Sequence, residues 1–85
     1  MIGVSPEEIR GKILDILAKK EKCTLAEIIR ETEIPLHDIE IELTGLRKMG
    51  LVVKEGKYYS FPEEHRKTER ARQKYRDMIA IWYRY

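Results

Sequence analysis

The chain of 85 residues is poor in the residue types that build cross-linked, metal-stabilised or catalytic domains. Its single cysteine, Cys23, excludes an internal disulfide, and its two histidines lie far from any cluster at metal-ligand spacing. It also lacks a glycine-rich phosphate loop and any recognisable pairing of a nucleophile with a base. The sequence therefore predicts no metal site, no cofactor and no enzymatic activity.

Long apolar runs are absent as well. No segment reaches the ~18 consecutive apolar residues of a membrane-spanning helix, and the N-terminus does not have the pattern of a signal peptide. With 42% hydrophobic and 38% charged residues, the composition is typical of a globular domain. We expect one small cytoplasmic domain that does not contact a membrane.

The charge is unevenly distributed, although the net charge is only +2. Residues 1–62 hold 10 Lys/Arg and 11 Asp/Glu, whereas residues 63–85 hold 7 Lys/Arg and 4 Asp/Glu. Such an asymmetry can indicate a nucleic-acid contact, but the mixed signs at the end of the chain are equally typical of a solvated helix face. Both interpretations stay open on charge alone.

Capping signals and apolar periodicity predict three helices in the first 49 residues. Ser5 and Thr24 each precede a glutamate three residues later, which is the signature of a capping box. The first helix is expected from Pro6 to Lys20 and the second from Thr24 onward. Pro35 separates a third helix, which begins at Pro35 or Leu36 and continues to Met49. The second and third helices would form a helix-turn-helix.

A tight hairpin is predicted directly after the third helix. Gly50 ends that helix, residues 51–53 form a β-prone run, Glu55-Gly56 supplies the turn and residues 58–61 return. Cys23-Thr24 is placed to add a short third strand, with Cys23 as a small buried hydrophobe. We expect Tyr59 to pack in the core, whereas the role of Tyr58 stays open.

This order of elements resembles the winged helix-turn-helix superfamily, especially its small prokaryotic transcription regulators. The resemblance covers roughly residues 5–61 and depends on Leu43, Leu46, Gly50, Leu51, Val52 and the segment Gly56-Lys57-Tyr58-Tyr59. It implies a mainly α, α+β fold with a winged-helix domain over residues 1–62 and a C-terminal dimerisation helix over residues 63–85, both in a single domain. It also implies that the third helix enters the major groove of duplex DNA.

The resemblance and the basic residues together give a set of candidate DNA-binding residues. These are His37, Thr44, Arg47, Lys48, Lys54, Lys57, Tyr58, Arg66, Lys67 and Arg70. The third helix departs from the pattern of DNA-binding relatives because Asp38, Glu40 and Glu42 would repel phosphates. Ile41, an exposed apolar residue among acids, suits a protein contact. The alternative function is therefore a module whose acidic third helix docks a protein partner.

The end of the chain carries a heptad-like apolar pattern of two repeats, typical of a short coiled coil. Its members and their apolar neighbour form the candidate dimer interface: Ala71, Tyr75, Met78, Ile79, Trp82 and Tyr85. We predict one helix of about 23 residues from Glu63 to Tyr85 that either pairs with a second copy or folds back onto the first helix, and we favour the homodimer. The alternation of apolar residues from Ile79 to Tyr85 also fits a terminal strand.

Overall fold

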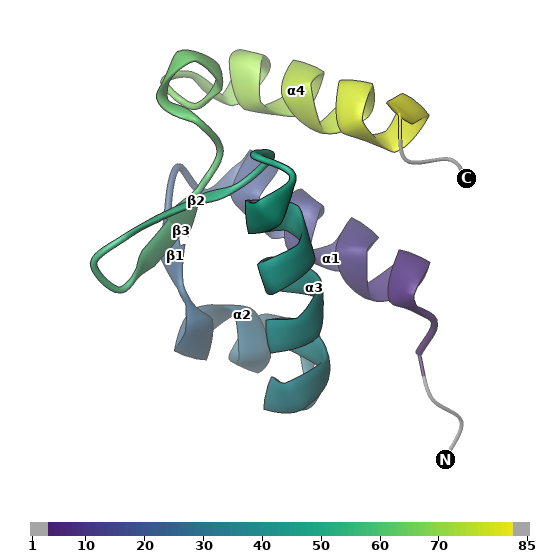
Figure 1. Ribbon diagram of the computed structural model, residues 1–85. Coiled ribbons are helices and arrows are strands. Elements are labelled where there is room, and N and C mark those ends of the chain that lie inside the picture. The colour runs from purple at the N-terminus through teal and green to yellow at the C-terminus, as the bar shows by residue number, and fades with distance from the viewer. Residues whose placement is uncertain (1–3, 83–85) are drawn as a thin grey trace.

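The computed structural model describes residues 4–82 and has the predicted winged helix-turn-helix fold, followed by a C-terminal helix (Figure 1). The described helices are α1 (Pro6–Lys19), α2 (Leu25–Thr32), α3 (Leu36–Lys48), the short 3₁₀ helix η1 (Glu63–His65) and α4 (Glu69–Trp82). The strands are β1 (Cys23–Thr24), β2 (Val53–Glu55) and β3 (Tyr58–Ser60). They form one antiparallel sheet in the order β1-β3-β2, so the prediction of a third strand at Cys23-Thr24 is confirmed.

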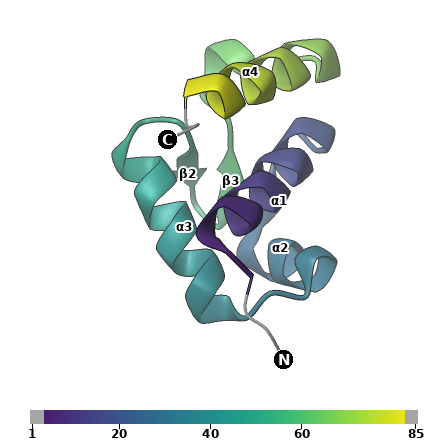
Figure 2. The ribbon, with the colours of Figure 1, turned by 90° about the vertical axis from the view of Figure 1, so that its right-hand side faces the viewer.

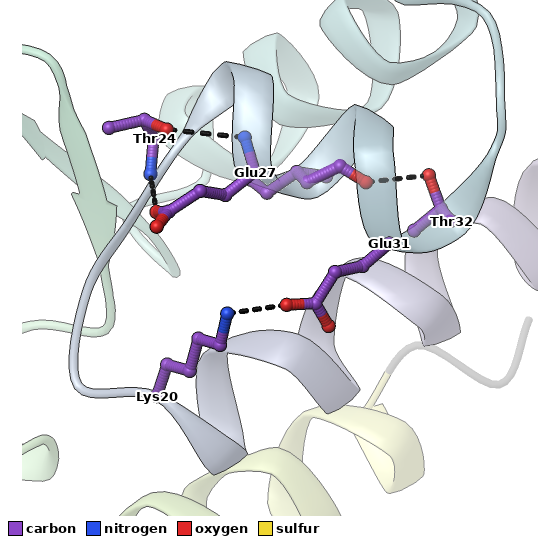
Figure 3. A network of polar contacts seen from close by, with 6 residues as sticks. Lys20, Thr24, Glu27, Glu31 and Thr32 are labelled. Atoms are coloured by element: carbon purple, nitrogen blue, oxygen red, sulfur yellow. Dashed lines mark hydrogen bonds and ion pairs between the residues drawn. The ribbon is translucent and has the colours of Figure 1, made fainter.

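Both predicted capping boxes are present. At the start of α2 the Thr24 hydroxyl accepts from the Glu27 amide at 3.2 Å, and the Thr24 amide donates to the Glu27 carboxylate at 2.8 Å (Figure 3). This backbone hydrogen bond lowers the pKa of Glu27 because it favours the charged carboxylate. Close by, an ion pair between Lys20 and Glu31 joins the end of α1 to α2. Local sequence thus fixes where α2 begins and how it meets α1.

The hairpin returns at Tyr58 as predicted, but its first strand starts two residues later and its turn lies one residue later than predicted. Leu51 and Val52 are buried in the core before β2 starts at Val53, and the pairing of Glu55 with Tyr58 places the turn at Gly56-Lys57. Gly56 has φ +62°, a left-handed conformation that glycine adopts without strain and that two-residue hairpin turns favour. Of the β-prone run at residues 51–53, only Val53 belongs to a strand, and Leu51 and Val52 pack in the core.

The core surrounds α1. Ile13, Leu17 and Phe61 are fully buried, and α1 lies between α2 and α3 with α4 across its other side (Figure 2). Cys23 is also fully buried, and burial raises the pKa of its thiol to about 11. The cysteine is therefore a packing residue, as predicted, and stays protonated at neutral pH.

The predicted single helix from Glu63 is wrong in its start. η1 ends at His65, and α4 begins only at Glu69, where the Thr68 hydroxyl accepts from the Ala71 amide at 3.0 Å. Thr68 therefore acts as a helix cap, which explains the new start. The chain is helical from Glu69 to Trp82, so the alternative of a terminal strand does not apply to the described residues. Tyr85 lies outside the described residues.

A buried arginine fastens α4 to the end of α1. Arg72 is only 8% exposed, and its guanidinium donates to the carbonyl oxygens of Ala18 at 3.1 Å, Lys19 at 3.4 Å and Arg66 at 2.7 Å. Ala18 and Lys19 are the last residues of α1, where carbonyl groups lack helical partners and the helix dipole favours a cation. Arg72 thus satisfies the end of α1 and the loop before α4 with one side chain.

Two members of the predicted dimer interface belong to the chain's own core. Tyr75 is 6% exposed and Ile79 is fully buried, because α4 folds back onto α1. Tyr75 also donates to the Leu51 carbonyl at 3.2 Å, and burial raises the pKa of this phenol, which keeps it a donor. Tyr75 and Ile79 are therefore withdrawn from the surface that a second copy could reach, which corrects the sequence-based interface.

We predict that Arg72→Met lowers the free energy of unfolding by about 2–4 kcal/mol, because one buried and two partly buried carbonyl groups lose their donor while the methionine keeps the apolar stem. Urea unfolding followed by circular dichroism measures the change. Arg70→Met, at an exposed position two residues earlier in α4, is the matched control and should change stability by less than about 0.5 kcal/mol. Equal stability of the two variants would contradict the proposed role of Arg72.

Candidate nucleic-acid interface

One face of the molecule combines the outer side of α3 with the hairpin. It holds two shallow hollows that share Thr44, Arg47 and Lys54. We call their lining residues the α3–wing face: His37, Glu40, Ile41, Thr44, Arg47, Lys48, Val52, Val53, Lys54 and Tyr59.

The period of α3 determines which side chains reach this face. Ile39, Leu43 and Leu46 are at most 1% exposed and hold the inner side of α3 in the core. Residues 37, 40, 41, 44, 47 and 48 follow the same helical spacing on the opposite side. The hairpin closes the face at its edge, where the Lys54 ammonium lies 5.6 Å from the centroid of the Tyr59 ring.

The structure separates the three carboxylates that argued against DNA. Glu42 does not line the α3–wing face: its Oε1 lies 3.6 Å from Nε of Arg10 in α1, and its side chain is only 16% exposed. Asp38 lies in the first turn of α3 and is half-buried, a position where the helix dipole favours an acid. Only Glu40 lines the hollows, so the expectation of three carboxylates facing a duplex is corrected to one.

The charged side chains that line the face are consequently mostly positive. Arg47, Lys48 and Lys54 contribute three cations against the carboxylate of Glu40. His37, at the start of the stripe, and Thr44, near its middle, add hydrogen-bonding groups. The face therefore offers both positive charge for phosphates and short polar groups for base edges.

Other predicted DNA-binding residues lie elsewhere. Tyr58 immediately precedes Tyr59 in β3, so its side chain lies on the opposite side of the strand. The ammonium groups of Lys22 and Lys57 lie 4.7 Å and 5.7 Å from the centroid of its ring. Neither Lys57 nor Lys67 lines either hollow of the α3–wing face.

The two remaining arginines are also separate from this face. Arg66 donates to the Ser60 hydroxyl at 2.8 Å and pairs with Glu55 at 3.6 Å, so its contacts fasten η1 to the hairpin. Arg70 borders a hollow on the outer surface of α4. The structure therefore brings together His37, Thr44, Arg47, Lys48 and Lys54 from the predicted set and disperses the rest.

Sequence reasoning missed the contribution of the hairpin's apolar residues. Val53 and Tyr59 line the hollows beside α3, and Tyr59 does so while only 7% exposed. The strand register places Lys54 opposite Tyr59, so these two side chains share one side of the hairpin, whereas Val53 pairs with Ser60 on the other side.

The described residues contain neither a metal-ligand cluster nor a membrane-spanning helix. Within residues 4–82, no group of three or more His, Cys, Asp or Glu side chains could hold a metal ion. None of the helices in this part of the chain is both long and apolar enough to cross a bilayer.

Comparison with known proteins supports the fold. No protein-family model and no curated protein matches the chain. The solved structure of wild-type ZitR from Lactococcus lactis is similar, with a TM-score of 0.60 and 17% sequence identity over 98% of this chain. The chain spans 58% of the ZitR chain. At this identity the likeness shows a shared fold, in agreement with the winged-helix architecture described above.

Proposed function

We propose that the chain binds duplex DNA through the α3–wing face and acts as a transcription regulator. The observation that carries this proposal is the orientation of α3, which turns Glu42 toward Arg10 and leaves Arg47, Lys48 and Lys54 around the exposed stripe. The winged-helix fold is compatible with this function because an exposed helix of this kind fits the major groove.

The chemistry of the face suggests a division of labour. Arg47, Lys48 and Lys54 lie at the end of α3 and on the adjacent strand, where they would neutralise phosphates and fix the register of the protein. His37 and Thr44 lie along the exposed stripe of α3 and would approach the base edges. The hairpin, with its two-residue turn, is short and would contact the backbone beside the groove.

The same proposal includes a homodimer formed through the outer side of α4. After Tyr75 and Ile79 are buried, this side still exposes Ile81 at 66% and Trp82 at 64%, next to half-buried Met78 and Ala71. A mostly apolar hollow includes Ala71, Met78 and Ile81, and exposed apolar surface of this kind favours association. A symmetric pair could place two α3 helices in successive major grooves.

A protein-docking module is the alternative function, favoured by one observation. Ile41 is 55% exposed in the centre of the α3–wing face, where a large apolar side chain suits a protein contact. The two functions differ in their response to salt, because phosphate binding releases counterions.

We predict that a fluorescently labelled duplex of mixed sequence binds the full chain at about 50 mM salt, with an affinity that falls linearly on logarithmic axes as salt rises. Fluorescence anisotropy measures the slope. Arg47→Ala should reduce the magnitude of the slope by about 1, as expected for one lost phosphate contact. Lys12→Ala, at an exposed position of α1 that lines neither the α3–wing face nor the apolar hollow of α4, is the control and should leave the slope unchanged.

A pair of carboxylate variants sharpens this experiment. Glu40→Gln should tighten binding to the mixed-sequence duplex by about fivefold because it removes a negative charge from the α3–wing face, whereas Glu42→Gln should not. Absence of binding at low salt would refute DNA binding and favour the docking module. Equal tightening by both variants would contradict the assigned orientation of α3.

For the dimer, we expect light scattering at micromolar concentration to give twice the 10.1 kDa chain mass. Ile81→Glu should shift the mass to that of one chain, since it places a charge in the apolar surface of α4. Ala80→Glu, at the exposed neighbouring position outside the apolar hollow, should keep the dimer. A single-chain mass for the unmodified protein would rule out this interface.

A further inference from the structure

Ile41 is the one large apolar side chain that stands well exposed within the α3–wing face. It is 55% exposed, and the side chains one helical turn away on the same stripe are His37 and Thr44. Glu40 lies beside it in the same hollow. An isoleucine that is surrounded by polar groups here keeps much of its apolar surface in water and so gains little hydrophobic stabilisation from this position.

Folding does not use this side chain. The described core and the partly buried residues packed against it do not include Ile41, whereas Ile39 and Leu43 on either side are at most 1% exposed. Replacing Ile41 should therefore leave the fold intact. A molecule that covers the α3–wing face would bury this side chain and gain its hydrophobic stabilisation.

In the major groove, the apolar group presented by a base pair is the C5-methyl group of thymine. A helix seated in the groove by Arg47, Lys48 and Lys54 would direct its central stripe, and with it Ile41, toward the base edges. We infer that Ile41 is a specificity-determining residue that contacts the C5-methyl group of a thymine. This inference rests on the proposed DNA binding.

Glu40 is compatible with the same docking. Its carboxylate accepts hydrogen bonds and cannot donate them, so near a base edge it suits the N4 amino group of cytosine and opposes the acceptor atoms of guanine. The pair thus favours base edges that carry a methyl or an amino group. A protein partner would instead cover Ile41 with apolar side chains and would show no dependence on a base methyl group.

The decisive experiment removes that methyl group. A preferred duplex is first selected from a random pool with the full chain, and each thymine is then replaced in turn by deoxyuridine, which lacks only the C5-methyl group. We expect roughly fourfold weaker binding at one or two positions, the effect of burying one methyl group. Ile41→Ala should bind the thymine duplex more weakly and should no longer distinguish uracil from thymine at those positions.

Two further variants act as controls. Leu36→Ala truncates another exposed apolar residue of α3, 47% exposed, that does not line the α3–wing face, and it should keep the uracil effect. Ile41→Val should retain part of the effect because it removes only the Cδ1 methyl group and keeps both γ carbons. Unchanged circular dichroism spectra would exclude misfolding as the cause.

The outcomes separate this inference from the proposed function. If the full chain binds DNA but no deoxyuridine position matters, or the selection enriches no sequence, the assignment of Ile41 is overturned while DNA binding stands. Persistence of the uracil effect in Ile41→Ala overturns it as well. If no duplex binds at low salt, both the inference and the proposed function fail.

Discussion

The contact between α4 and the rest of the chain is the constraint on which the other features depend. The guanidinium of Arg72 donates to carbonyl groups at the end of α1 and in the loop before α4, and no carboxylate within residues 4–82 forms an ion pair with it. Arg76 adds a 2.6 Å ion pair with Asp15 of α1. Through Tyr75 the same helix reaches the Leu51 carbonyl, at the junction between α3 and the hairpin. A chain of 85 residues can bury only a limited share of its surface, and α4 enlarges the core by adding Tyr75 and Ile79 to it.

The orientation of α3 follows from its packing against α1 and α2. The inner residues Ile39, Leu43 and Leu46 are at most 1% exposed, and the pairing of Glu42 with Arg10 holds the flank of α3 against α1. The opposite stripe is then left exposed. The α3–wing face is thus a consequence of packing: the side chains on it are those that the core and the flank do not use, and most of its charges are positive.

Local signals carried most of the fold. The capping boxes at Ser5 and Thr24, the glycine that ends α3 and the alternation of Tyr58 and Tyr59 act within a few residues, so sequence alone could place the helices and the hairpin. Long-range pairings could not be read in this way. Arg72 finds Ala18, which is 54 positions away, and the Glu42 charge is matched by a residue of another helix. For the same reason half of the candidate DNA-binding residues lie away from the α3–wing face, because a sequence gives the charge of a side chain but not the surface on which it lies.

We propose that duplex DNA binds the α3–wing face and not the basic C-terminal helix. Nuclear magnetic resonance of the ¹⁵N-labelled full chain titrated with a short duplex tests it most directly. The claim predicts amide shift changes concentrated at Thr44, Arg47 and Lys54, with Gln73 and Asp77 on the outer surface of α4 unaffected. Changes concentrated on α4, with those of α3 and the hairpin absent, would contradict it.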